Sequence, residues 1–440
     1  MRINPVMRLG LAAAVIGVLA GSAFATNGYL SHGAGLRAKA AGGAAVAFPQ
    51  DGLAGGNNPA STAFLETRFD VGLDWLRLSR GGEITGNAGG DDVNGAYDAD
   101  DWKNFLLPEI GYNKRYSENV TMGFVLCSRT WMNTDYTEPI PVFGDTRAGL
   151  DLIQVLLTPY FSYSINDKHS IGFGLNIGWQ TFEVTGLQNF AALDTLVEGP
   201  DTTVVGRYSM SPSAVTDRGH EGSMGLGLSM GYMGRVHPRV DLALVYQTRT
   251  HMGRFKKYEG LFAEQGDFDM PASLAGGIAV RANDRIALAF DIQHLWYSRV
   301  KSLGNPLQPN ITDALLGEDG GAGLGWKDVT AFKFGVAFDV APMVKLLGGY
   351  NYGQQPVQPS ETLLNMLIPA VVEHHLTLGA AVKTCWGPEI TLAYTHAFSN
   401  KVNGSGSIPS GTPPEECCGG GETDIEMSAN AFGAALGWTF

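Results

Sequence analysis

The sequence predicts an all-β fold: a transmembrane antiparallel β-barrel of about 14 strands with an N-terminal plug in its lumen. Three observations lead to this fold class: a secretory leader, apolar and polar residues that alternate along many segments, and connections that alternate between tight turns and long loops. The mature chain has no run of about 18 or more consecutive apolar residues, which excludes a helical membrane protein.

The start of the chain has the three parts of a secretory signal peptide. Two arginines come first, residues 9–21 form an apolar core, and Ala23-Phe24-Ala25 matches the small-x-small rule for cleavage. The apolar core is shorter than the roughly 20 residues that a membrane-spanning helix needs. We therefore expect residues 1–25 to be removed and the mature chain to begin near Thr26.

The composition fits many short strands and excludes nucleic acid as a partner. The chain has 30 Lys and Arg against 43 Asp and Glu, a net charge of -13, so it would repel a polyanion. Glycine is abundant at 59 residues, and only 17% of the residues are charged, which is low for a soluble chain of this size. The cysteines, with Cys417 and Cys418 adjacent in a loop, do not form a disulfide framework, and we expect neither a metal nor another cofactor.

Apolar residues alternate with polar or small ones from Arg68 to the end, so residues 68–440 form the predicted barrel. The period of two is seen near residues 69–75, 120–126, 171–179, 224–232, 242–246, 286–292, 332–338, 376–382 and 432–440. A soluble β-sandwich would show the same pattern with its apolar face turned inward. Alternation alone therefore does not decide between the two architectures.

The connections between these strands favour the membrane barrel. Tight connections lie at Ser117-Glu118, Asn166-Asp167, His237-Pro238, Asn283-Asp284, Ala341-Pro342-Met343 and Trp386-Gly387. Long connections run over residues 80–103, 187–219, 301–325 and 401–426. Strict alternation of the two kinds is typical of outer-membrane barrels, which have short periplasmic turns and long external loops. Because hydrocarbon cannot satisfy backbone N–H and C=O groups, such a sheet must close on itself.

Residues 26–67 come before the first strand and show neither helical nor strand periodicity. A barrel of about 14 strands has a lumen too wide for its own side chains, which fill the bore completely only near about 8 strands. A segment rich in Gly and Ala packs closely against a wall, and Asn58-Pro59 is a turn signal. We therefore expect residues 26–67 to form a plug inside the barrel.

This segment resembles the N-terminal hatch of the FadL-type outer-membrane transporters of long-chain fatty acids and other hydrophobic compounds. The resemblance rests on Asn27-Gly28, Gly42-Gly43-Ala44, Asp51, Asn58-Pro59-Ala60 and, further on, Gly325-Trp326-Lys327-Asp328. Asn58-Pro59-Ala60 is similar to the family's NPA signature, and with the strand count the likeness covers essentially the whole mature chain. It implies capture of a hydrophobic ligand by external loops, binding in the lumen, and sideways release after the hatch moves.

Apolar residues in two external loops are candidates for the capture groove. They are Phe190, Leu193, Val197, Leu261 and Phe262. The first three follow a helical spacing. Exposed apolar groups on external loops mark a binding groove, whereas buried ones would only pack loop on loop, and the sequence leaves both interpretations open.

Basic residues that the alternation places on the inward face are candidates for binding a carboxylate head group. They are Arg129, Arg249, Arg299, Lys327 and Lys333. A carboxylate in a partly dehydrated lumen needs a cationic partner. Lys327 matches the lysine of the family's Gly-aromatic-Lys-Asp element and is the first choice. The alternative is that these cations pair with lumenal aspartates in structural networks, namely Asp70, Asp74, Asp241, Asp291 and Asp339.

Two departures from the family pattern leave the ligand open. Residues 172–186 contain no Arg or Lys, although family members can carry a second head-group partner on this strand. The third strand has no glycine after Gly123, where the family forms its lateral gap by a kink. Both departures favour a neutral ligand, such as an aromatic hydrocarbon, as the alternative to a long-chain fatty acid.

Two other classes compete with the transporter. A general porin would conduct ions through an open polar channel, which a plug would block. A barrel lipase would need a serine and a histidine with a third, orienting group, and we expect no enzyme activity. We expect a monomer in the outer membrane, in contact with membrane lipid and lipopolysaccharide. The acidic residues 89–101 could bridge lipopolysaccharide through divalent ions, but solvated surface fits their spacing better.

Overall fold

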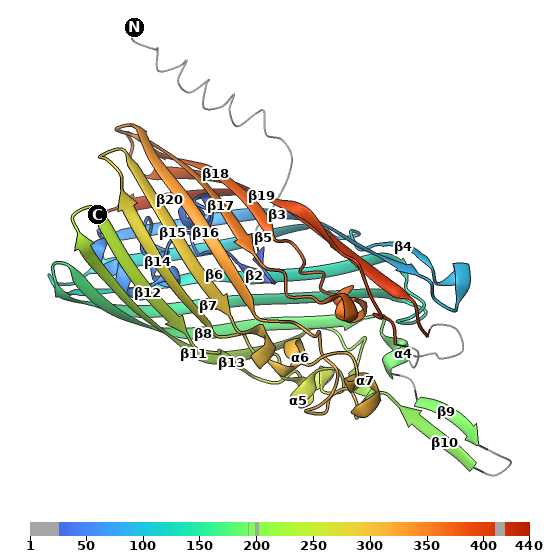
Figure 1. Ribbon diagram of the computed structural model, residues 1–440. Coiled ribbons are helices and arrows are strands. Elements are labelled where there is room, and N and C mark those ends of the chain that lie inside the picture. The colour runs from blue at the N-terminus through green and yellow to red at the C-terminus, as the bar shows by residue number, and fades with distance from the viewer. Residues whose placement is uncertain (1–25, 192, 199–201, 410–418) are drawn as a thin grey trace, which may run out of the picture.

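The computed structural model describes residues 26–191, 193–198, 202–409 and 419–440 (Figure 1). The expected signal peptide, residues 1–25, and the Cys417-Cys418 pair lie outside the described residues. The first and last long strands of the sheet pair with each other, so the chain forms a closed barrel.

The wall consists of 14 antiparallel strands, and each pairs with its neighbours in the sequence. They are β3 (Arg68–Thr85), β5 (Asn104–Arg115), β6 (Val120–Pro139), β7 (Arg147–Asn166), β8 (His169–Thr185), β11 (Glu221–His237), β12 (Val240–Gln247), β14 (Ser273–Arg281), β15 (Ile286–Leu295), β16 (Val329–Ala341), β17 (Val344–Gly353), β18 (His374–Lys383), β19 (Glu389–Val402) and β20 (Glu422–Thr439). Two short strands extend the sheet: β4 (Gly95–Asp98) beside β3, and β13 (His251–Met252) beside β11. The predicted all-β barrel is confirmed.

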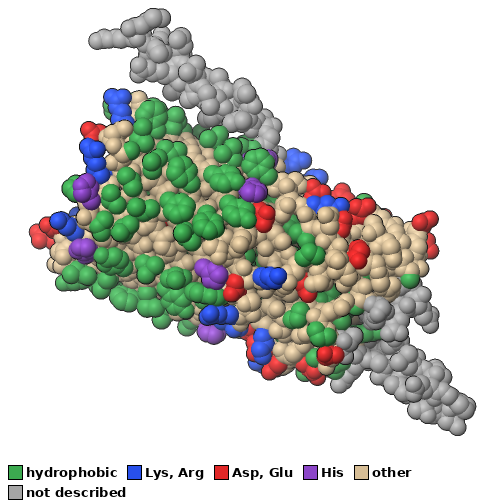
Figure 2. Space-filling model, in the orientation of Figure 1, with side chains coloured by type: hydrophobic (Ala, Val, Ile, Leu, Met, Phe, Trp, Pro, Cys, Tyr) green, Lys and Arg blue, Asp and Glu red, His purple; other side chains and the backbone are tan. Residues whose placement is uncertain are grey.

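The wall is inside out relative to a soluble protein. Large apolar side chains such as Trp75, Phe124, Leu226 and Phe334 point outward and are between 36% and 58% exposed. Figure 2 shows apolar side chains gathered over the strands of the barrel. Water would make such a surface unfavourable, whereas hydrocarbon solvates it. The direction of the apolar face therefore separates the membrane barrel from a soluble sandwich.

The two ends of the barrel differ, as the connection lengths predicted. Tight turns join the strands at the end where the C-terminus lies, on the left in Figure 1, and we call it the turn end. The long connections form the loop end and hold short elements: η2 (Gly90–Asp92), α4 (Gln188–Ala191), β9 (Leu193–Glu198), β10 (Thr202–Arg207), η3 (Pro212–Ala214), η4 (Lys256–Tyr258), α5 (Ala263–Gly266), η5 (Tyr297–Arg299), α6 (Lys301–Gly304), α7 (Asn310–Asp313), η6 (Pro359–Glu361) and α8 (Thr362–Asn365). None of the helices in the described residues has the length and apolar character to cross a membrane.

One expectation about the loops is wrong. The helical spacing of Phe190, Leu193 and Val197 does not correspond to one helix, because only Phe190 lies in α4. Leu193 and Val197 lie in β9, which pairs with β10 as an antiparallel hairpin. The sequence carries a signal for this outcome: Thr and Val residues, which favour strands, stand on both sides of Gly199-Pro200.

The N-terminal segment, residues 26–67, lies inside the barrel toward the turn end, in blue in Figure 1. Its elements are β1 (Thr26–Asn27), β2 (Leu30–Ser31), α2 (Leu36–Ala40), α3 (Ala54–Asn57) and η1 (Pro59–Phe64), and most of its residues are buried. Gly42 shows why the segment is rich in glycine. Its φ is +67°, and a Cβ there would lie 2.5 Å from the carbonyl oxygen of Phe334 in the wall. Such a close approach of two backbones requires glycine.

Candidate functional site

Buried ion pairs join the N-terminal segment to the wall. Lys39 of α2 contacts Asp74 of β3 and lies 2.9 Å from a carboxylate oxygen of Glu109 in β5. Burial alone would lower the pKa of Lys39, but the two carboxylates raise it above its ordinary value, so the ammonium stays charged. Loss of Lys39 would leave both buried carboxylates without their cation.

A second charged group surrounds Arg37 and Asp51 of the segment. Arg37 contacts Glu389 of β19, and Arg68 holds Glu389 and Asp70, each at 2.7 Å. Asp51 is buried and accepts a hydrogen bond at 3.0 Å from the backbone N–H two residues further on. Its burial, with the negative charge of Asp70 nearby, raises the pKa of Asp51 to about 7. The predicted hatch residue Asp51 therefore lies in an environment where protonation occurs near neutral pH.

The Asn58-Pro59-Ala60 turn is fixed to the wall by hydrogen bonds. The side-chain oxygen of Asn58 accepts from the N–H of Ala60 at 3.0 Å, and its amide donates to the carbonyls of Val46 at 3.0 Å and Tyr232 at 3.3 Å. The carbonyl of Ala60 accepts from two serine hydroxyls of β7 and β8. Pro59 begins η1, where its fixed φ suits the turn.

Asn27 and Gly28 fix the start of the segment at the opposite side of the lumen. The carbonyl of Asn27 accepts from the hydroxyl of Tyr297, and its side-chain oxygen accepts from the amide of Asn351 at 3.1 Å. Gly28 has a φ of +66°, and a Cβ there would lie 2.8 Å from the ring of Tyr297. Every hatch residue that the sequence singled out thus lies at a contact between the segment and the barrel or in a turn that makes one.

Arg129 and Lys333, two of the predicted lumenal cations, line one small cavity between the N-terminal segment and the wall. The ammonium of Lys333 donates to the carbonyl of His32 at 2.6 Å and to the side chain of Gln293 at 2.7 Å. Arg129 forms no ion pair with any described residue, and its Nε is buried without a hydrogen-bond acceptor. The cavity has a volume of about 30 Å³, which holds about one or two water molecules.

Arg249 and Arg299 lie away from this cavity, near the loop end. Arg249 contacts Asp269 and lies 2.8 Å from a carboxylate oxygen of Asp267. Arg299 is exposed, and its guanidinium lies 4.8 Å from the ring centroid of Trp296. Arg249 is therefore part of a structural network, but its partners are not among the aspartates that the alternative interpretation named.

Lys327, the first choice for a head-group partner, is exposed. The preceding residue, Trp326, is buried instead, and its indole N–H donates to the side chain of Asn365 at 2.6 Å. Successive side chains of an extended chain point in opposite directions, so Lys327 points away from the interior that Trp326 enters. The expectation that Lys327 faces the lumen is corrected.

The predicted groove residues pack inside the loop end. Phe190 is 1% exposed, and Phe262 is 8% exposed with its ring centroid 4.8 Å from that of Phe182. Leu261 packs against the same cluster. The side chains of Leu193 and Val197 lie outside the described part of the structure. Phe190, Leu261 and Phe262 therefore pack loop on loop, which is the alternative to an open groove.

The hydrogen-bond ladder of the wall is interrupted between β5 and β6. The two strands pair as far as Glu109 opposite Cys127, and the residues of β5 before Glu109 have no partner in β6. Pro108 stands at this point. Its carbonyl oxygen faces β6, 3.5 Å from the hydroxyl oxygen of Ser128, and as a proline it has no N–H to donate on the same side. The pairing therefore ends where a donor is missing.

A β-bulge in β6 lies at the same level. Ser128 stands opposite Val155 of β7 and Thr130 opposite Gln154, so Arg129 is the extra residue. A bulge bends its strand and changes the direction of a side chain, and here Arg129 lines the lumenal cavity beside the interrupted ladder. The third barrel strand is thus irregular without the glycine that the sequence argument looked for. Pro108, a proline inside a strand pattern, is the sequence signal that was missed.

Residues 363–372 fill the loop end from within. Leu363, Met366, Ile368 and Val371 are buried. The hydroxyl of Tyr136 in β6 donates to the carbonyl of Met366 at 3.0 Å. The lumen is therefore occupied at the turn end by the N-terminal segment and at the loop end by this connection.

A G-x-S-x-G sequence, residues 227–231, occurs in β11. In hydrolases this motif places the serine in a sharp strand-to-helix turn. Here Ser229 is buried in the middle of a strand that pairs on both sides, and its hydroxyl has no hydrogen-bond partner among the described residues. Ser229 therefore does not have the strand-to-helix position that this motif gives the serine in hydrolases.

Comparison with known structures identifies the same architecture. The chain is similar to a FadL homologue of Pseudomonas aeruginosa, with 16% identity, a TM-score of 0.68 and coverage of 94% of this chain and 100% of that one. It is similar to the toluene transporter TodX of P. putida, with 16% identity, a TM-score of 0.65 and coverage of 93% and 99%. It is also similar to the toluene transporter TbuX of Ralstonia pickettii, with 16% identity, a TM-score of 0.62 and coverage of 93% and 99%.

These structures show the fold, while the family follows from the sequence. A search of curated proteins finds no significant match. A family model described as outer membrane protein transport protein (OMPP1/FadL/TodX) matches residues 12–440. The chain therefore belongs to the OMPP1/FadL/TodX family, whose members are non-enzymatic β-barrels of the outer membrane that transport hydrophobic compounds.

Proposed function

We propose that this chain takes up long-chain fatty acids and that Arg129 binds their carboxylate in the lumen. The observation that supports this most directly is the guanidinium of Arg129, which has no ion-pair partner among the described residues and lines the cavity beside the interrupted ladder. A buried Nε–H without an acceptor is unfavourable, and a carboxylate is the partner that guanidinium geometry fits best.

Binding requires the N-terminal segment to move. The cavity of about 30 Å³ is too small for an amphiphile, and Lys333 is held by the carbonyl of His32, which belongs to the segment. When the segment withdraws, the cavity widens and Lys333 loses this acceptor. A second cation then becomes available to the carboxylate, so ligand binding and displacement of the segment favour each other.

The interrupted ladder between β5 and β6 is the proposed exit toward the membrane. Arg129 lies two residues beyond Cys127, the last residue of β6 that pairs with β5. A head group bound by Arg129 would therefore lie beside the part of the wall where β5 and β6 form no hydrogen bonds with each other. The apolar chain of the ligand can pass between them without breaking a ladder, whose backbone groups would be costly to expose to hydrocarbon.

An aromatic hydrocarbon is the second candidate ligand, and one feature favours it. Tyr29, Tyr297 and Trp326 form a buried aromatic cluster in the barrel, with ring centroids between 5.2 Å and 5.7 Å apart. Rings at such distances form favourable edge and offset contacts, which a monoaromatic ligand could share. Such a ligand would need no cation, so the two candidates differ in their dependence on Arg129.

Two binding measurements in detergent separate the candidates. We expect Arg129→Met to weaken binding of a long-chain fatty acid by about tenfold or more, because a charge-assisted hydrogen bond contributes about 1.5–3 kcal/mol. Affinity for toluene should not change. Lys327→Met, which removes an exposed cation, is the matched control and should affect neither ligand.

Equal loss of both ligands in Arg129→Met would show that Arg129 is structural. Tight toluene binding together with no measurable fatty-acid binding in the wild-type protein would favour the hydrocarbon. Mass spectrometry of hydrophobic molecules that copurify with the barrel gives an independent identification. A planar-bilayer recording tests the porin alternative, for which the filled lumen predicts low conductance.

A further inference from the structure

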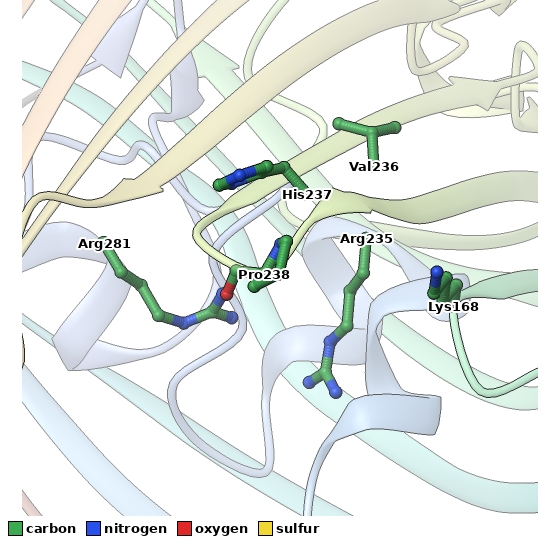
Figure 3. Close-up of a pocket in the computed structure, with 6 residues that line it drawn as sticks. All are labelled: Lys168, Arg235, Val236, His237, Pro238 and Arg281. Atoms are coloured by element: carbon green, nitrogen blue, oxygen red, sulfur yellow. The ribbon is translucent and has the colours of Figure 1, made fainter.

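A second cavity opens at the turn end, which is the periplasmic end in this family of barrels. It has a volume of about 460 Å³, within the range of roughly 300–1,000 Å³ typical of small-molecule sites. Its lining residues are Lys168, Arg235, Val236, His237, Pro238 and Arg281 (Figure 3). They come from the β7–β8 turn, the end of β11 with the turn that follows it, and the end of β14, which pairs with β12.

Positive charge dominates this cavity on a chain whose net charge is -13. Lys168, Arg235 and Arg281 contribute three cations. Among the described residues, one carboxylate contacts them: Asp241 lies 2.6 Å from Arg281 and 3.9 Å from Arg235. The cations repel one another, so this arrangement lacks about two negative charges.

Hydrogen-bond donors around the cavity also lack acceptors. The Nε of Arg235 is buried and has no hydrogen-bond acceptor, because Asp241 at 3.9 Å is too far away to accept from it. One face of its guanidinium lies 4.2 Å from the ring centroid of Phe64 at the end of η1. In the described part of the chain, no residue forms an ion pair with the exposed ammonium of Lys168. The Nδ1 of His237 accepts from the backbone N–H of Arg239 at 3.2 Å, so its Nε2 carries the proton of the neutral ring and can donate.

We propose that this cavity binds a phosphate group. The two missing negative charges and the unused donors of an arginine, a lysine and a histidine match a phosphate better than a single carboxylate. Val236 points away from the three cations in Figure 3 and is 54% exposed, so the cavity borders the lipid-facing surface. The phosphate can therefore come from a phospholipid head group of the inner leaflet or from free phosphate in the periplasm. This inference does not depend on the ligand proposed for the lumen.

Two assays on the full mature protein test the proposal and separate the two sources. Isothermal titration with inorganic phosphate, against sodium chloride at equal ionic strength, measures binding of the free ion and corrects for general screening. Native mass spectrometry after exposure to mixed micelles of phosphatidylglycerol and phosphatidylcholine measures retention of the anionic lipid. Binding in both assays, or in titration alone, identifies a site for free phosphate. Retention of phosphatidylglycerol alone identifies a lipid head-group site.

Substitutions locate the site. We expect Lys168→Gln and Arg235→Gln each to weaken binding by about tenfold. Arg285→Gln, which removes a cation from the neighbouring β14–β15 turn outside the cavity, is the matched control and should have little effect. Lys168 is exposed in a turn, so Lys168→Gln should fold normally. It therefore tests the proposal even if Arg235→Gln does not fold. Absence of binding in both assays would overturn the proposal, as would equal losses in Lys168→Gln and Arg285→Gln.

Discussion

Lys39→Met is the substitution that best tests whether buried charge holds the N-terminal segment in the barrel. It keeps the length and apolar stem of the side chain but leaves Asp74 and Glu109 without their cation. Both carboxylates are almost fully buried, with exposures of 2% and 1%. Removal of one partner from a buried ionic group costs about 3–5 kcal/mol. Because the wall is held by its own strand pairing, this cost falls on docking of the segment.

A cost of this size lowers the docked fraction relative to the undocked one by roughly 10²–10⁴-fold. Hydrogen exchange of the amides in residues 34–47 should accelerate accordingly, and the conductance of the barrel in a planar bilayer should rise. The heat-modifiable migration of the barrel should stay unchanged. Lys401→Met is the matched control, because Lys401 is 40% exposed beside Glu83 and Asp424, where such pairs contribute about 0–1 kcal/mol.

Removal of the carboxylates should rescue the loss of the lysine. Lys39→Met combined with Asp74→Asn and Glu109→Gln removes every charge of the group, so docking should be partly restored relative to Lys39→Met alone. Unchanged exchange and unchanged conductance in Lys39→Met would refute the idea that these ion pairs hold the segment. Failure of the triple variant to recover any protection would show that the lysine acts through its packing instead of its charge.

Two further predictions concern the same segment. Because the pKa of Asp51 is raised to about 7 in the docked segment, protonation of Asp51 favours docking. This stabilisation is complete below about pH 4, the ordinary pKa range of a carboxyl group, and is lost as the pH rises through about 7. Hydrogen exchange of the segment, corrected for intrinsic rates, should therefore be slower at pH 5 than at pH 8, and Asp51→Asn should abolish the difference. A wild-type protein whose exchange does not depend on pH would contradict the raised pKa of Asp51. Pro59→Ala removes a fixed φ from the turn that Asn58 and Ala60 attach to the wall, so exchange near residues 58–62 and ligand uptake should both change. Unchanged protection and uptake would count against a gating role for this turn.

The barrel could be predicted from the sequence because the membrane imposes a simple rule on every strand. Alternating side chains face hydrocarbon and lumen, so residues such as Phe334 and Leu226 could be assigned to the outward face one strand at a time. The loops follow no such rule. Residues 363–372 are an apolar run whose place depends on contacts with distant residues, such as Tyr136 and Asn400.

The roles of the lumenal cations could not be predicted, for a related reason. Alternation places Arg129 and Lys333 inside the barrel, but their partners are set by the path of the N-terminal segment. Lys333 is held by a backbone carbonyl, that of His32, which no side-chain pattern reveals. The inward position of Lys327 was predicted by extending the alternation back past Val329, the first residue of β16, to the junction with the preceding loop, where no strand exists. The structure turns Trp326 inward there, and the lysine outward.

The interrupted ladder and the docked segment contribute unequal barriers to the proposed path of the ligand. Where β5 and β6 no longer pair, an aromatic contact still joins them, with the rings of Phe105 and Trp131 5.2 Å apart. An aromatic contact of this kind contributes about 0.5–1.5 kcal/mol beyond the burial of its area. Disruption of the Lys39 ion pairs costs about 3–5 kcal/mol, before the hydrogen bonds of Asn27 and Asn58 are counted. Displacement of the N-terminal segment is therefore the larger barrier, and a ligand that offers a carboxylate to Arg129 and Lys333 recovers part of it only after the segment has moved.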